Sequence, residues 1–247
     1  MDRSLYIAMS GAKQTLLAQT ANANNLANSQ TVSFKSDLAQ FRSMPVFGPG
    51  FPARVYAMTE RPGTNLDFGP LQTTGRDLDV AVKGDGWIKV EGRDGEEAYT
   101  RAGDFRITQQ GFLQTGSGLK VLGESGQPII IPPADKVEIG QDGTISIIPL
   151  GDDASTLAVV ETIQLVNPDA GSIEKRSDGL MYHKNGEKLA ASAEVSLISG
   201  ALEGSNVNAI EAMVEMIELA RNFELQTKVM SAVDENSGVS AKLMQMA

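Results

Sequence analysis

Residues 5–26 read LYIAMSGAKQTLLAQTANANNL, and this stretch indicates how the chain begins its fold. Its apolar residues advance in alternating steps of four and three, which is the heptad spacing of a single helical face. That face comprises Leu5, Met9, Ala12, Leu16, Gln19, Ala23 and Leu26. We expect an axial helix within residues 1–30 that pairs with another helix along this narrow seam. The alternative is a short amphipathic helix docked on its own domain.

A second long helix is predicted at the other end of the chain, over residues 205–247. Asn208 is expected to cap its first turn, because asparagine side chains accept hydrogen bonds from free amide groups at helix starts. Its apolar stripe comprises Ile210, Met213, Ile217, Ala220 and Phe223, followed by Leu225, Val229, Ala232, Val239 and Leu243. Both predicted helices are longer than the intervening domain needs.

Between the helices, the pattern changes twice. Residues 45–75 contain five of the ten prolines and five glycines, a density that blocks regular helices and central strands, so we expect an extended connector over residues 31–76. Residues 77–204 alternate short apolar runs with glycine-containing turns, which is typical of antiparallel strands. The predicted fold class is α+β, with long N- and C-terminal helices paired as a coiled-coil-like tube element around a central antiparallel all-β domain.

Composition excludes several classes of function. The 247 residues include 21 basic and 31 acidic side chains, and the net charge of −10 would repel nucleic acid. No apolar run approaches the roughly 18 residues of a spanning helix, so direct membrane insertion is not expected. There is no cysteine, which excludes disulfides and thiolate chemistry. The N-terminal segment lacks the apolar core of a cleaved secretory signal, so any export is expected to use another route.

The sequence offers little that could perform catalysis. Its single histidine, His183, lies in a polar hairpin-like run and is expected at the surface. Asp77 and Asp79 have the spacing of a carboxylate pair on one strand face, as a glycosidase needs, but are expected to point to solvent. We therefore expect no enzyme, no cofactor and no metal. A carboxylate-based hydrolase and a secreted adhesin or binding module are the rival classes, and a binding module leaves both long helices unexplained.

Four sequence segments resemble the bacterial flagellar rod and hook family. Residues 23–35, ANNLANSQTVSFK, are similar to the family's N-terminal signature. Residues 202–208, LEGSNVN, with MVEMI and RNFE further on, resemble its C-terminal signature. Residues 78–87, LDVAVKGDGW, and 99–105, YTRAGDF, resemble its central motifs. The match departs at Ser33, where glycine is usual, so we expect the backbone there to avoid conformations that only glycine adopts easily.

Length and the two chain ends are most similar to the proximal rod members of this family, with the distal rod members second. The resemblance implies a structural subunit of the basal-body rod, a hollow periplasmic shaft that transmits torque and surrounds an export channel. It also implies a homo-oligomer in a helical assembly, contact with other flagellar rod proteins, and export through the flagellar type III apparatus.

The subunit-interaction residues are expected on the two helices and in the signatures beside them. They are Leu5, Met9, Ala12, Leu16, Ala23, Asn24, Asn25, Leu26, Asn28, Phe34, Asn206, Asn208, Met213, Met216, Ile217, Arg221 and Phe223. For Asn24, Asn25 and Asn28, two interpretations stay open: amides that fix the register of a partner, as buried asparagine does in coiled coils, or simple helix termination.

Overall fold

The computed structural model describes residues 4–39, 41–45, 55–59, 63–151 and 157–245. The chain divides into two compact units. The helical unit comprises Met1–Ser29, Ser36–Asn65 and Val207–Ala247, and the β unit comprises Gln30–Lys35 and Leu66–Asn206. Each unit therefore contains segments that are far apart in the sequence.

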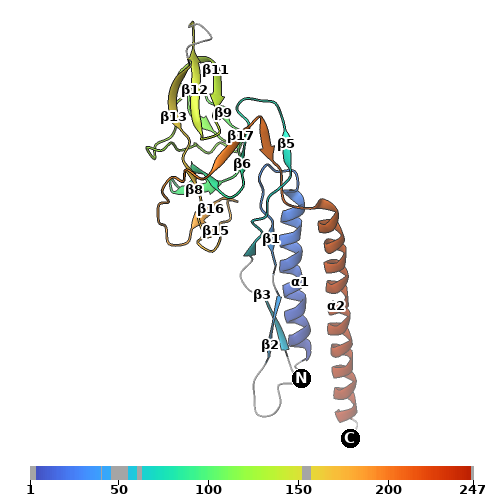
Figure 1. The fold of residues 1–247 in the computed structure, drawn as a ribbon. Helices are drawn as coiled ribbons and strands as arrows, with labels where there is room; N and C mark the ends of the chain where they lie inside the picture. The colour runs from blue at the N-terminus through green and yellow to red at the C-terminus, as the bar shows by residue number, and fades with distance from the viewer. Residues whose placement is uncertain (1–3, 40, 46–54, 60–62, 152–156, 246–247) are drawn as a thin grey trace. The chain divides into compact units, whose positions relative to one another are not determined.

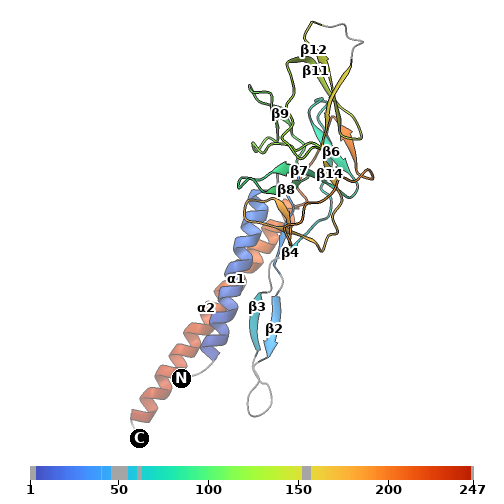
Figure 2. The same ribbon diagram turned by 90° about the vertical axis from the view of Figure 1, so that its left-hand side faces the viewer.

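The helical unit contains two helices and four short strands. Helix α1 spans Ser4–Ala27 and helix α2 spans Ala209–Gln245, and they run antiparallel beside each other (Figures 1 and 2). Strands β2 (Phe41–Pro45) and β3 (Val55–Thr59) pair with each other, as do β1 (Asp37–Leu38) and β4 (Gly63–Thr64). Strand β3 packs on α1, where the Ser10 hydroxyl donates a hydrogen bond to the Ala57 carbonyl at 3.0 Å.

Helix ends are set by asparagines. The Asn208 side chain accepts a hydrogen bond from the Ile210 amide at 3.1 Å, so the predicted cap of the second helix is confirmed. At the end of α1, the Asn28 side chain donates to the Asn24 carbonyl at 2.9 Å, and the Asn28 backbone amide donates to the same carbonyl at 3.1 Å. Neither helix in the described part of the chain is both long and apolar enough to cross a membrane.

The β unit is built from short antiparallel strands. Its largest sheet has the order β14-β7-β8-β16-β15, and a second sheet has the order β11-β12-β13. Three further pairs are β10 with β9, β17 with β6, and β18 with β5. The strands span Leu71–Thr73 (β5), Val80–Lys83 (β6), Trp87–Glu91 (β7), Glu97–Thr100 (β8), Arg106–Ile107 (β9), Leu113–Gln114 (β10), Ala134–Ile139 (β11), Thr144–Pro149 (β12), Ala158–Thr162 (β13), Leu165–Val166 (β14), Ile173–Lys175 (β15), Met181–His183 (β16), Ser196–Ser199 (β17) and Ala201–Glu203 (β18).

The core of the β unit lies between these strands. Its fully buried large side chains include Ile88, Tyr99, Phe105, Leu113 and Ile145. They come from alternate positions of strands and from the turns that join them, which is why the sequence shows short apolar runs there. The middle of the chain is thus antiparallel β structure, as the apolar alternation indicates.

The predicted pairing of two long helices as a coiled-coil-like tube element is wrong. Helix α1 is short, with 24 residues, and α2 has 37, while the larger part of the fold is antiparallel β structure. The predicted seam is also not the packed face of α1. Leu5, Met9 and Leu16 are exposed, and of the seam residues only Ala12 is fully buried.

The physical reason is that small residues, rather than the large apolar ones, form the buried face of α1. The buried residues of α1 are Ala8, Ala12, Ala18 and Asn22. A Cβ atom added at Gly11 would lie 3.0 Å from the side-chain nitrogen of Gln226 in α2, so the Gln226 side chain packs on Gly11. Small side chains permit this distance, whereas leucine would hold the two backbones apart.

Candidate subunit-interaction site

The outer surface of α2 carries an apolar stripe, which we call the outer stripe. Its members are exposed, with Ile210 at 75% and Ile217 at 64% of their maximal surface. The outer stripe comprises Ile210, Val214, Ile217, Leu225 and Val229. At about 100° per residue, these positions lie on roughly the opposite side of the helix from Ala212, Leu219 and Phe223, which face inward. Helix α2 is therefore apolar on both sides.

Helix α1 has a comparable exposed face. Leu5, Tyr6, Met9, Leu16 and Leu17 each expose more than a third of their surface. Leu5, Met9 and Leu16 lie beside Ala12, the buried member of the seam. Single exposed apolar residues are ordinary in proteins, but contiguous apolar stripes mark surfaces that contact other proteins. These two faces are the strongest candidates for contacts with another chain in the helical unit.

The structure distributes the sequence-predicted interaction residues over both kinds of surface. Along the helices, the predicted set divides into exposed, half-buried and buried positions. Leu5, Met9, Leu16, Ala23, Asn24, Asn208, Met213, Ile217 and Arg221 are exposed; Asn25, Leu26, Asn28, Met216 and Phe223 are half-buried; Ala12 is buried. The exposed members lie on or beside the two outer faces, and the half-buried ones lie largely where each helix packs within its own unit.

Two of the predicted asparagines bond within their own chain. The Asn25 side chain donates to the Asp37 carbonyl and accepts from the Asp37 amide, both at 2.9 Å, and so fastens strand β1 to α1. Asn28 bonds to Asn24, as described above. Sequence reasoning missed Asn22, which is buried and donates to the Ala212 carbonyl of α2 at 2.7 Å.

Phe34 and Asn206 lie in the β unit, beside a group of buried charged side chains. We call Lys35, Arg101 and Glu203 the ionic cluster. Glu203 accepts from the Lys35 ammonium group at 2.7 Å and from the Arg101 Nε atom at 2.7 Å. The three side chains are at most 3% exposed. The Gly69 amide donates a third hydrogen bond to Glu203, at 3.0 Å.

The cluster joins three segments that enter the β unit from different parts of the sequence. Asn206 donates from its amide nitrogen to the Phe34 carbonyl at 3.2 Å and from its side chain to the Asp67 carbonyl at 3.1 Å. The Lys175 ammonium group lies 4.0 Å from the centre of the Phe34 ring. Residues 30–35, 66–69 and 203–206 are thus fastened to one another.

The electrostatics of the cluster follow from its burial. Burial alone would raise the pKa of Glu203, but hydrogen bonds from Lys35, Gly69 and Arg101 outweigh it and lower that pKa. Burial lowers the pKa of Lys35, and the bond to Glu203 only partly offsets this effect. The site therefore holds a charged carboxylate between two cations, and all three side chains make hydrogen bonds within the chain.

Ser33 lies beside the cluster and has a left-handed backbone, with φ at 54°. The prediction that this residue avoids a glycine-like conformation is therefore wrong. Two hydrogen bonds hold the strained backbone: the Ser33 hydroxyl donates to the Arg101 carbonyl at 2.7 Å, and its amide donates to the Glu203 carbonyl at 2.9 Å.

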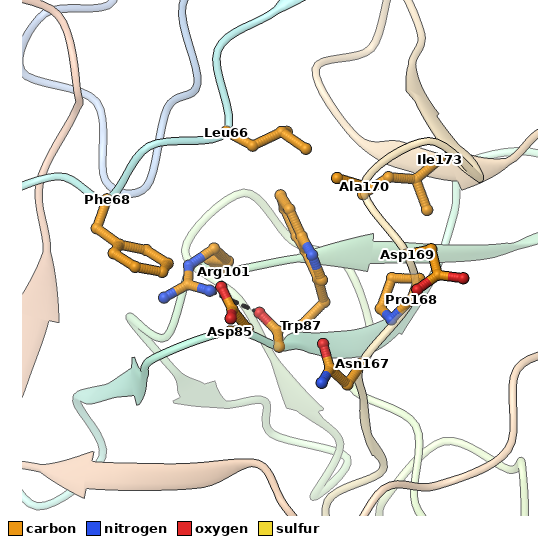
Figure 3. A pocket seen from close by; sticks show the side chains of 11 residues that line it. Leu66, Phe68, Asp85, Trp87, Arg101, Asn167, Pro168, Asp169, Ala170 and Ile173 are labelled. Atoms are coloured by element: carbon orange, nitrogen blue, oxygen red, sulfur yellow. Dashed lines mark hydrogen bonds between the residues drawn. The ribbon is translucent and has the colours of Figure 1, made fainter.

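A pocket of about 320 Å³ opens on the outer side of Arg101 (Figure 3). The Phe68 ring and the Trp87 indole lie on two sides of the guanidinium group, with ring centres 4.8 and 5.8 Å away. Asp85 and Asp169 lie at the rim. Arg101 already donates to the carbonyls of residues 82, 84 and 86 as well as to Glu203, so the pocket wall serves to pack this arginine.

The carboxylates considered for catalysis do not form a reactive pair. Asp79 is buried and accepts a hydrogen bond from Arg76 at 3.2 Å, so the expectation that it points to solvent is wrong. Asp77 is exposed. Among the described residues, no group of three or more histidine, cysteine or acidic side chains could hold a metal ion.

Comparison with known proteins assigns the family. Residues 198–243 match the family model of the C-terminal region of the flagellar basal body rod FlgEFG proteins. Residues 81–147 match the family model of the D1 domain of the flagellar hook proteins FlgE/F/G. Over the full length of both chains, the sequence is 40% identical to the flagellar basal-body rod protein FlgF of Salmonella typhimurium. The chain belongs to the flagellar basal-body rod protein family.

Other relatives agree with this assignment. The FlgF protein of Escherichia coli is also 40% identical over the full length of both chains. The FlgG protein of Bacillus subtilis is 32% identical over 95% of this chain and 96% of its own length. The resemblance to the flagellar rod family is thus confirmed, and the chain is a structural subunit of the flagellar basal body that assembles with other rod components.

The family's sequence signatures also contain the ionic cluster. Lys35 ends the first signature, Arg101 lies in the YTRAGDF motif and Glu203 lies in the LEGSNVN motif. The available signal was the presence of a charged residue within each of these three motifs. Their mutual contact could not be read from the sequence, because the three residues are separated by 66 or more positions.

Proposed function

We propose that this chain is a subunit of the proximal rod that polymerises with copies of itself through the exposed faces of α1 and α2. One observation carries the proposal: α2 packs on α1 with one side and exposes the outer stripe on the opposite side. Covering a large apolar side chain contributes roughly 1.5–3 kcal/mol. A second copy, with its own exposed α1 face, can provide that cover.

The polymer would be a hollow periplasmic shaft that transmits torque, with its subunits delivered by the flagellar type III export apparatus. The chain is proposed to act without catalysis, which the pairing of buried Asp79 with Arg76 supports. A distal rod position is the second candidate, and the similarity to FlgG of Bacillus subtilis favours it.

Replacement of Ile217 by aspartate tests the proposed contact. The introduced charge would have to be buried in the polymer, so we expect incorporation into rods and motility to be lost, while the purified monomer keeps its helix content because Ile217 is exposed. The matched control is Asn222→Asp, which adds the same charge to α2 at an exposed polar position. Normal motility of the Ile217→Asp strain would contradict the proposal.

A further inference from the structure

Sulfur is distributed unevenly in this chain. There are ten methionines and no cysteine, so the thioether group is the only sulfur chemistry available. Nine of the methionines lie in the sequence of the helical unit, and Met181 alone lies in that of the β unit. Met181 is 3% exposed, within an apolar cluster that contains Trp87 and Tyr99.

Two methionines lie on the proposed interaction faces. Met9 of α1 is 54% exposed and follows Leu5 by four residues, so it shares the exposed face of that helix. Met213 of α2 is 53% exposed and precedes Ile217 by four residues, at the edge of the outer stripe. Both sulfur atoms therefore belong to side chains that solvent reaches in the single chain.

We propose that Met9 and Met213 are oxidation sites whose conversion to methionine sulfoxide weakens the association of subunits. The oxidant is a peroxide. Its O–O bond breaks as one oxygen atom bonds to the thioether sulfur, the sulfur loses two electrons, and the remaining oxygen leaves as water with the hydrogens of the peroxide. This inference rests on the proposed function, because the helix faces must be the contact surfaces.

The physical basis is the change in polarity at a surface that must become dry. A thioether packs as an apolar, flexible group, whereas the sulfoxide oxygen is a strong hydrogen-bond acceptor. Burying such an acceptor without a donor opposes association. The reaction is reversible by methionine sulfoxide reductases, so its effect on association is reversible too.

The first measurement identifies the oxidised positions. The purified full-length chain is treated with hydrogen peroxide, and tryptic peptides are followed by mass spectrometry. We expect Met9 and Met213 to be oxidised at least tenfold faster than the buried Met181. Equal rates for all three methionines would overturn the proposal, because they would show that the two positions have no special exposure.

The second measurement follows association by sedimentation velocity at increasing protein concentration. Each variant is compared with its own untreated sample, so any change in basal association does not affect the comparison. We expect peroxide to weaken the association of the native chain at least tenfold and to have less than a twofold effect on the Met9→Leu/Met213→Leu variant. Met181→Leu is the matched control and should keep the full sensitivity to peroxide.

The outcomes separate this inference from the proposed function. Failure of the untreated native chain to associate would contradict the proposed contact surfaces themselves. Association that persists unchanged when Met9 and Met213 are fully oxidised would overturn the inference alone. Treatment with methionine sulfoxide reductases should restore association, and persistent weakness after complete reduction would also count against it.

Discussion

Glu203 accepts three hydrogen bonds from groups that lie far apart in the sequence. The flanking cations Lys35 and Arg101 donate two of these bonds, and the Gly69 amide donates the third. A buried ion pair does not by itself prove a gain in stability, because both charges were desolvated on folding. Removing one partner has a definite consequence, since the remaining buried charges then lose their compensation.

Replacement of Glu203 by glutamine is expected to lower the free energy of unfolding of the β unit by about 3–5 kcal/mol. The two cations would lose the carboxylate that neutralises them. Urea unfolding followed by fluorescence measures the change, because Trp87 is the only tryptophan and belongs to the β unit. The control is Glu91→Gln, which breaks the more exposed pair with Lys120 and should change stability by less than about 1 kcal/mol.

Acid is expected to weaken the same cluster. The pKa of Glu203 is lower in the folded protein than its ordinary value of 4.5, so below that value the unfolded chain binds more protons than the folded one. The contribution of Glu203 to the free energy of unfolding is fully present above about pH 4.5, and it is lost as the pH falls through the pKa of Glu203 in the folded protein. Urea unfolding between pH 3 and 7 should show this loss in the native chain, and a native slope no steeper than that of Glu203→Gln would contradict it.

At the scale of single elements, α1 carries two faces with different tasks. Its buried face holds small residues that let α2 approach, and its exposed face holds the larger apolar residues. Most of the large residues with heptad spacing are exposed, and of the seam only Ala12 is buried, which is why periodicity alone indicated the wrong face for packing. A difference of one residue turns a helix by about 100°, so a small error in phase changes the predicted contact completely.

Replacement of Ala18 by leucine is expected to separate the helices locally. Ala18 is 3% exposed, so the added carbon atoms would have to displace neighbouring groups, and the helical unit should lose about 1–3 kcal/mol of stability. Thermal melting followed by circular dichroism at 222 nm measures this. The matched control is Leu17→Ala, an exposed neighbour that should change stability by less than about 0.5 kcal/mol. Equal effects of both changes would show that Ala18 is not at a tight contact.

For the whole molecule, net charge and apolar faces have opposite effects on association. Each chain carries a net charge of −10, so copies repel one another at low salt. The outer stripe is apolar, and its burial is not weakened by salt. Raising the ionic strength to about 0.15 M reduces the Debye length to about 8 Å and screens the repulsion.

We therefore expect added sodium chloride to strengthen the self-association of the native chain, as measured by sedimentation velocity. The Ile217→Asp variant is the control and should stay largely monomeric at every salt concentration. Association that weakens steadily with salt would indicate that charge pairs, rather than the apolar faces, hold the subunits together.

The sequence by itself determined the family, the two helical ends and the antiparallel β structure of the middle. These features depend on local patterns: the heptad steps after Leu5, the cap at Asn208, and apolar runs separated by glycine turns. Such patterns act over a few residues, so they are readable without the fold.

Only the tertiary structure decided which helix face is packed, how Lys35, Arg101 and Glu203 meet, and why Ser33 adopts a left-handed backbone. Each depends on groups brought together from distant parts of the chain. Ser33 is held by the carbonyls of Arg101 and Glu203, and neither partner is near it in sequence. The contact at Gly11 likewise depends on the Gln226 side chain of α2. The reason is physical: local spacing fixes what an element is, but the free energy of burial and pairing depends on which surfaces meet.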